Sequence, residues 1–130
     1  MPLSNDRNTP RREGEMLSDP VAAAGVIYAG SLVVLGATGY AEAASTATGL
    51  KARGIAQQYV NNEGADGAEK IVTRRGVHRL GNDGSINRTH ITGTAYIVDD
   101  ETVAATDGTS TRSAAGTIID VDDDGVWVDL

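Results

Sequence analysis

Short turn signals recur along most of this chain at intervals of about 8–12 residues, and they constrain its fold more than any other feature. Clusters such as residues 36–39 (GATG) and 81–84 (GNDG) separate apolar runs rich in Val, Ile and Thr, which favour extended backbone. No segment has the apolar spacing of an amphipathic helix of three turns. The sequence therefore predicts an all-β protein, a small β-barrel or sandwich, over residues 20–130.

These turns set the boundaries of about eight expected strands. Gly76 interrupts the run 70–80 (KIVTRRGVHRL), where we expect a β-bulge or a close backbone approach. Residues 86–93 (INRTHITG) are compatible with one short helical turn. The expected strands are the two halves of 26–35, then 54–60, 70–80, 94–98, 102–105, 117–121 and 126–130.

Residues 1–19 form a separate unit in the sequence, polar and without helical or strand periodicity. Their prolines remove backbone donors and oppose both helix and central strand. We expect an extended N-terminal arm that precedes the β-rich domain 20–130 and is either disordered or laid onto a partner. Arg7, Arg11 and Arg12 are the candidate contact residues of this arm.

The apolar stretch 21–35 (VAAAGVIYAGSLVVL) has the outline of a signal-peptide core. Gly25 and Gly30 oppose the helix that such a core needs, and acidic residues precede it where a leader is basic. Its fifteen residues are also fewer than the roughly 20 that span a bilayer as a helix. We expect a pair of buried strands and no membrane partner. The absence of cysteine fits assembly in a reducing cytoplasm.

Charge is distributed unevenly around a net value of −7. Residues 1–90 contain 10 basic and 9 acidic residues, whereas residues 91–130 contain Arg112 alone against 9 acidic residues. A surface this acidic repels phosphate backbones, so we expect no nucleic-acid partner.

The segment 120–125 (DVDDDG) is the strongest chemical motif, because it matches the start of a calcium-binding loop. The sequence supplies no glutamate at the twelfth position of that loop, and the flanking runs favour strands over helices. We therefore interpret it as an acidic hairpin turn with Asp124 and Gly125 at its corner, and expect no metal. His78 and His90 lack a carboxylate at ligand spacing, and no nucleophile has a legible base partner. These patterns predict no catalytic residue, no cofactor and no enzyme activity.

The last strand offers a different clue. With a period of two, Val126, Val128 and Leu130 point one way and Trp127 points the other. Trp127 is then either an exposed interface anchor or part of a strand buried on both faces. Arg74, Arg75 and Arg79 form a second candidate contact patch, which either pairs with the acidic region of a neighbouring subunit or is a solvated face. Because the chain has no Phe, its core is thin, and subunit contacts are expected to supply part of the stability.

Three segments carry a family likeness when they are read in order. They are PVAAAGVIYAGSLVVLGATGYA (20–41), TGLKARGIAQQYVNNEGADGAEKIVTRRGV (48–77) and TAYIVDDETVAATDGTSTRSAAGTIIDVDDDGVWV (94–128). Together they resemble the capsid cement, or head decoration, proteins of tailed phages. One departure is His78, where an aromatic residue such as Phe is expected.

This resemblance implies a non-enzymatic β-protein that binds the exterior of a mature icosahedral head, commonly as a homotrimer at local three-fold axes. The implied partners are the major capsid protein and other copies of the chain. The implied location is the outside of the virion, after synthesis in the host cytoplasm. The competing hypothesis is a receptor- or glycan-binding module of a phage tail or cell surface, which would need several exposed aromatic side chains.

Overall fold

Strands form almost all the regular structure of the computed structural model, which describes residues 2–9 and 14–130. Helix is confined to η1 (Arg88–His90), a short 3-10 turn inside the segment predicted to contain one, and amounts to 2%. The all-β prediction is therefore confirmed. The strands are β1 (Met16–Pro20), β2 (Val26–Ile27), β3 (Leu32–Leu35), β4 (Ala41–Ala43), β5 (Lys51–Ala56), β6 (Val60–Asn61), β7 (Lys70–Arg74), β8 (Val77–Asn82), β9 (Thr94–Ile97), β10 (Thr102–Ala104), β11 (Ala114–Asp122) and β12 (Gly125–Asp129).

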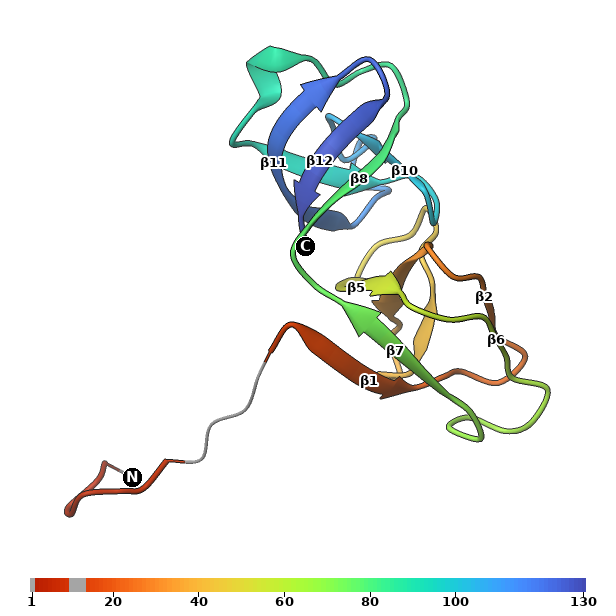
Figure 1. Ribbon diagram of the computed structural model, residues 1–130, viewed down its shortest axis with the longest axis vertical. Helices are drawn as coiled ribbons and strands as arrows, with labels where there is room; N and C mark the ends of the chain where they lie inside the picture. Colours follow the sequence, from red (N-terminus) through yellow and green to blue (C-terminus); the bar gives the residue numbers. More distant parts are fainter. Residues whose placement is uncertain (1, 10–13) are drawn as a thin grey trace.

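The C-terminal half of the chain closes into a barrel with the strand order β10-β8-β12-β11-β9. Pairing of β10 with β9 completes the ring, and β10 with β8 is its one parallel pair. Because side chains alternate across each strand, every second residue enters the interior. Ile97, Ile118, Val126 and Val128 fill it and are fully buried. The barrel forms the upper part of Figure 1.

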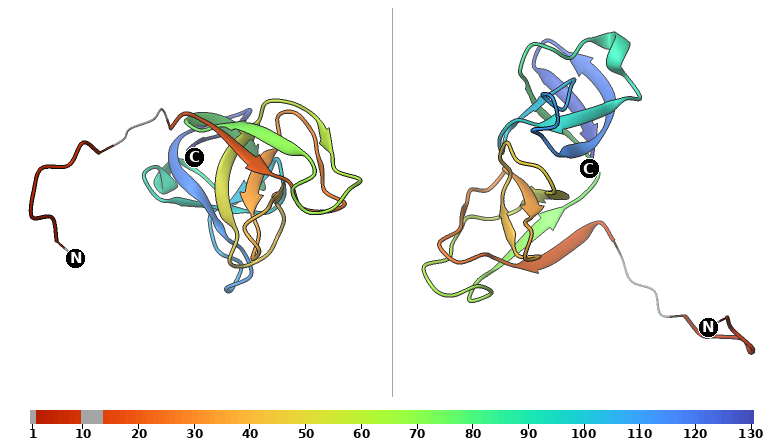
Figure 2. Two further views of the ribbon diagram at one scale, coloured as in Figure 1. Left: turned by 90° about the horizontal axis from the view of Figure 1, so that it is seen from below. Right: turned by 180° about the vertical axis from the view of Figure 1, so that it is seen from behind.

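The remaining strands form an open antiparallel sheet with the order β1-β7-β5-β3-β4, beside a small β2–β6 ladder. The right-hand view of Figure 2, like Figure 1, places these strands together on one side of the barrel. A second apolar cluster lies here, and its fully buried members are Val21, Ile27, Val33, Ala41 and Ile71. The stretch 21–35 contains two strands as predicted, but only β3 is buried along most of its length. In the first half Ile27 is buried, whereas Val26 and Tyr28 are exposed. No helix in residues 2–9 and 14–130 is long and apolar enough to cross a membrane.

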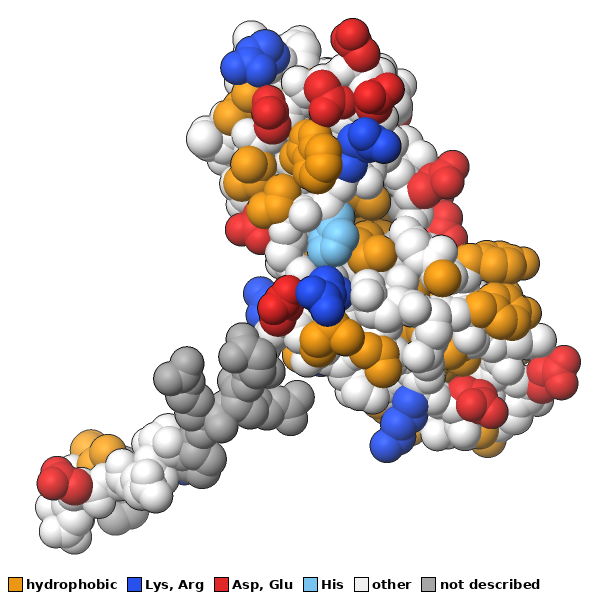
Figure 3. Space-filling view, in the orientation of Figure 1, with side chains coloured by type: hydrophobic (Ala, Val, Ile, Leu, Met, Phe, Trp, Pro, Cys, Tyr) orange, Lys and Arg blue, Asp and Glu red, His pale blue; other side chains and the backbone are white. Residues whose placement is uncertain are grey.

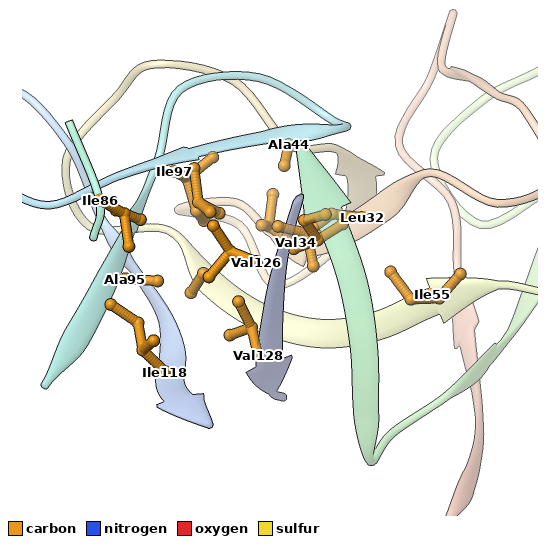
Figure 4. Packing of buried hydrophobic residues seen from close by; sticks show 13 residues of the cluster. Leu32, Val34, Ala44, Ile55, Ile86, Ala95, Ile97, Ile118, Val126 and Val128 are labelled. Carbon is orange, nitrogen blue, oxygen red and sulfur yellow. The ribbon is translucent and has the colours of Figure 1, made fainter. Parts of the chain in front are cut away.

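β3 belongs to both cores. Leu32 and Val34 pack with the barrel cluster, whereas Val33 packs with the second cluster. Figure 4 shows Leu32 and Val34 near Val126 and Val128 of the barrel strand β12. Because one strand contributes to two cores, the barrel and the open sheet share a packed interface instead of being joined by a linker.

The structure corrects the interpretation of the run 70–80. This run was predicted to be one strand with a bulge at Gly76, but it forms β7 of the open sheet and β8 of the barrel. Gly76 has φ of +109°, and nothing lies within 4 Å of where its Cβ would be. Backbone conformation therefore explains the glycine, because the chain turns here to leave one sheet and enter the other.

The predicted end of the arm at residue 19 is also wrong, because β1 pairs with β7 along its whole length. Leu17 and Asp19 are buried, and the Asp19 carboxylate accepts two hydrogen bonds of 2.9 Å from the Arg53 guanidinium. Residue 19 points inward but is acidic. The sequence therefore lacks the alternation of apolar and polar residues by which this strand would have been predicted. Residues 2–9 are exposed throughout.

Candidate functional site

Trp127 lies on the outer face of β12, as the period-two pattern predicts. Val126 and Val128 are fully buried, whereas Trp127 is partly exposed, so β12 is not buried on both faces. The indole Nε1 donates a 2.8 Å hydrogen bond to Asp122 Oδ2. The Arg79 guanidinium lies 5.9 Å from the centroid of the ring, within the range of a cation–π contact. The indole is therefore oriented by two polar neighbours and presents an ordered surface.

The acidic motif folds as the hairpin between β11 and β12. Asp122 is opposite Gly125, which places Asp123 and Asp124 at the corner, one residue earlier than expected. Asp122 Oδ1 accepts hydrogen bonds from the backbone N–H of Asp124 at 2.8 Å and of Gly125 at 3.0 Å. One carboxylate of the calcium-like motif therefore holds the turn together.

Several hydrogen bonds favour the ionised form of Asp122. The indole of Trp127 is the largest cause that lowers the pKa of this carboxyl group, followed by the Asp124 backbone amide. Partial desolvation opposes them, while the Gly125 amide and the charge of Arg79 add to the lowering. The outer face of this hairpin is thus an electrostatic network centred on Trp127.

The three arginines predicted as one patch are divided between two places. Arg79 lies opposite Trp127 on β8, 3.8 Å from Asp124. Arg74 is on β7 and pairs with Glu15 at 2.9 Å, and the Arg75 amide donates to the Glu15 carbonyl. Figure 3 shows basic side chains on the barrel and again near its junction with the open sheet. The structure therefore joins Arg79 to Trp127, and Arg74 and Arg75 to the base of the arm.

The arginines of the arm itself are only partly described. Arg7 is fully in the solvent-exposed segment 2–9. Arg11 and Arg12 lie outside the described residues, so their predicted role as contacts stays a prediction.

Sequence reasoning missed the largest exposed aromatic feature. Tyr28 follows β2 and Tyr59 precedes β6, and their side chains are 63% and 55% exposed. Their ring centroids are 5.4 Å apart with an interplanar angle of 40°. In the sequence, each tyrosine stands close to a turn, which only weakly predicts that its side chain is exposed. Only the pairing of β2 with β6 brings the two rings together.

The remaining polar groups form no recognised catalytic arrangement among the described residues. His90 Nδ1 accepts from the Asn87 amide as part of the capping of η1, and His78 Nδ1 lies 3.3 Å from the Gly76 carbonyl. A hollow of about 390 Å³ beside η1 is lined by Thr, His and Tyr side chains but by no carboxylate. In the same part of the chain, no three His, Cys, Asp or Glu residues gather as metal ligands.

Comparisons with protein-family models, with curated proteins and with solved structures each return no match to this chain. Its function is therefore argued from the residues and the geometry.

Proposed function

We propose that this protein is a structural component of a tailed-phage virion, which binds the outer surface of the head and stabilises the capsid lattice against internal DNA pressure. The observation that carries the proposal is the combination of an exposed N-terminal segment, residues 2–9, with a packed β-body that contains a closed barrel. The three ordered sequence segments that resemble cement proteins support it, and they extend over most of that body.

A clamp of this kind acts by mass action. A protein that binds the expanded lattice but not its disrupted form stabilises the lattice. For each site, the stabilising free energy grows with the logarithm of the free protein concentration divided by its Kd. No catalytic group or cofactor is needed for that effect. A body that resists deformation and an arm that reaches a neighbouring subunit are sufficient, and the net acidity keeps the outer surface away from released DNA.

The proposed contact on the body is the partly exposed Trp127 with Arg79 beside it. Burial of an indole removes a large apolar area from water, at about 25 cal/mol per Å². An aromatic residue with an adjacent arginine also has the composition typical of interface hot spots. Assembly as a homotrimer, with this surface at or beside a subunit or capsid contact, remains part of the proposal.

Co-sedimentation with purified undecorated heads tests the function directly. Deletion of residues 2–13, which precede β1, should reduce head occupancy while the far-UV circular dichroism of the body stays unchanged. Trp127→Ala should weaken binding to heads more than it lowers the free energy of unfolding. Trp127→Phe is the matched control, because it retains an aromatic ring but loses the hydrogen bond to Asp122.

Failure of the wild-type protein to bind heads of any phage that infects the producing host would contradict the proposed function. If the variant without residues 2–13 occupied heads as fully as the wild type, the arm would not contribute to head binding. A cryo-EM map of a decorated head would give the symmetry around each bound copy and decide the trimer.

The receptor- or glycan-binding alternative receives one specific observation, the exposed Tyr28–Tyr59 pair. The tilt of 40° between the rings means that one flat sugar face cannot stack on both. Binding of the labelled protein to a glycan array, abolished by Tyr28→Ala, would favour this alternative over the capsid proposal.

A further inference from the structure

The tyrosine pair is part of a larger apolar surface that is exposed among residues 2–9 and 14–130. Val26 on β2 is 39% exposed and adjoins the segment that carries Tyr28, and Tyr59 lies beside the paired strand β6. In Figure 3, hydrophobic side chains gather at the side of the molecule over β2 and β6. Clustered exposed aromatics of this kind mark binding surfaces more often than isolated ones.

An acidic loop borders this surface. Residues 99–101 (DDE) connect β9 to β10, and Asp100 and Glu101 line one hollow of about 500 Å³ together with Tyr28. The loop is held in place, because the Asp100 carbonyl accepts from the Leu32 amide at 2.7 Å and Asp99 Oδ1 accepts from the Glu101 amide at 2.9 Å. None of the ion pairs among residues 2–9 and 14–130 includes these three carboxylates.

This chemistry fits a basic, proline-containing peptide. A guanidinium group is attracted both to the face of a tyrosine ring and to a carboxylate, and here the two lie together. Proline-rich segments also dock in grooves lined by aromatic side chains, at low entropic cost because their extended conformation is already restricted. The exposed tyrosine pair offers such an aromatic surface, next to the hollow that Tyr28 lines with Asp100 and Glu101. One flat sugar ring cannot stack on both tilted rings at once.

The chain itself contains a segment of that composition. Residues 2–12 (PLSNDRNTPRR) have two prolines and three arginines against one acidic residue. The described part of the segment, residues 2–9, is exposed along its whole length. In Figure 1, β2 and β6 lie beyond the end of β1, on the side opposite to the start of that strand.

We propose that the N-terminal arm of a second copy binds across the Tyr28–Tyr59 surface, with its arginines facing Asp100 and Glu101. Each copy then supplies an arm to one neighbour and a binding surface to another. Such a head-to-tail contact closes into a ring when the rotation between copies permits. The contact needs no capsid, so it stands or falls separately from the proposed function.

Engineered cysteines test the contact in the full-length protein, which contains no natural cysteine. Arg7→Cys protein is mixed with Gln58→Cys protein and oxidised, since Gln58 is exposed next to Tyr59. The control mixture pairs Arg7→Cys with Asp123→Cys, at the exposed tip of the barrel hairpin. We expect the disulfide-linked heterodimer to form at least about tenfold faster in the first mixture. Equal rates in the two mixtures would overturn the proposal.

Charge reversal provides a second test by sedimentation velocity of the free protein. Arg11→Glu with Arg12→Glu should weaken self-association by about tenfold, the size expected for loss of a buried charged contact. Adding Asp100→Lys and Glu101→Lys should restore it, whereas Asp123→Lys with Glu63→Lys should not. A monomeric wild-type protein, or rescue by the control pair, would contradict the contact.

These measurements use no heads, so the two proposals fail separately. A wild-type protein that binds heads but does not self-associate would overturn only the arm contact. Self-association without any head binding would remove only the function.

Discussion

The barrel and the open sheet of this protein treat their strand edges in opposite ways. Every barrel strand is paired on both sides, so no ladder of unpaired backbone groups remains. The open sheet ends at β1 and β4. Among the described residues, four exposed large hydrophobic residues lie in or beside this sheet, Met16, Val26, Tyr28 and Tyr59, against two on the barrel, Val77 and Ile119. The comparison teaches that the closed region supplies a rigid body with the proposed Trp127–Arg79 contact on its outer face. The open region instead leaves two strand edges and the Tyr28–Tyr59 pair available to another chain.

Stability and binding capacity are nevertheless not separated into two domains. β3 packs against both cores, through Leu32 and Val34 on one face and Val33 on the other. A strand shared in this way couples the unfolding of the two regions. The difference between them is therefore one of surface chemistry more than of independent folding.

The largest expected effect tests this coupling with one core truncation in each region. Ile118→Ala in the barrel and Ile71→Ala in the open sheet both remove a fully buried side chain, and each should cost about 2–5 kcal/mol of unfolding free energy. Urea denaturation is followed by Trp127 fluorescence, which reports on the barrel, and by far-UV circular dichroism, which reports on all strands.

In each variant, the fluorescence and dichroism signals should shift together to one lower urea midpoint, because the cores share β3. If Ile71→Ala lowered the dichroism midpoint but left the Trp127 midpoint in place, the two regions would unfold independently and the comparison above would need redrawing.

A smaller effect is expected from the ion pairs at the edge of the open sheet. Asp19→Asn removes the charge of a largely buried carboxylate that accepts two hydrogen bonds from Arg53. This change should lower the free energy of unfolding by about 1–3 kcal/mol. Glu15→Gln is the matched control, because the Glu15–Arg74 pair has the same 2.9 Å distance but is about half exposed. Exposed pairs contribute at most about 1 kcal/mol.

Thermal melts in low and high salt compare these two variants. Equal melting temperatures for Asp19→Asn and Glu15→Gln would mean that β1 is not anchored through its buried carboxylate. Limited proteolysis near residue 16 should likewise increase only in Asp19→Asn.

The smallest effect concerns the Asp122 network on the barrel. Its pKa is lowered in the folded state, chiefly by the Trp127 indole, relative to an ordinary value of 3.8. Ionised Asp122 therefore stabilises the hairpin above pH 3.8, and this contribution is lost as the pH falls from 3.8 through the lower folded-state pKa. The difference in melting temperature between wild type and Asp122→Asn should be constant near neutral pH and vanish in that acidic window.

Asp123→Asn, at the exposed corner of the same turn, should show no such pH-dependent difference. Trp127 fluorescence should change over the same acidic window in the wild type only. A difference between wild type and Asp122→Asn that persists undiminished at pH 2 would show that the carboxylate charge is not what holds the indole.

Local patterns in the sequence predict those features that depend on neighbours along the chain. Alternation in 126–130 predicts the buried valines and the outward Trp127, and the Asp-rich turn predicts the β11–β12 hairpin. The same reasoning fails at residues 16–19, where an inward Asp19 replaces the apolar residue that alternation would require. It fails again in 70–80, where a single glycine is compatible with either a bulge or a crossover between sheets.

The sequence by itself thus determined that this protein is all-β, where several of its turns lie, and which face of the last strand is apolar. It did not locate the breaks inside 54–60 and 70–80, which separate β5 from β6 and β7 from β8. Only the tertiary structure decided that the barrel closes through β10 and β9, that β3 serves two cores, and that Tyr28 meets Tyr59. The physical reason is the range of the interactions. Strand period and turn conformation are set by adjacent residues. Strand pairing instead joins segments far apart in the chain, and which segments pair depends on the packing of the whole molecule.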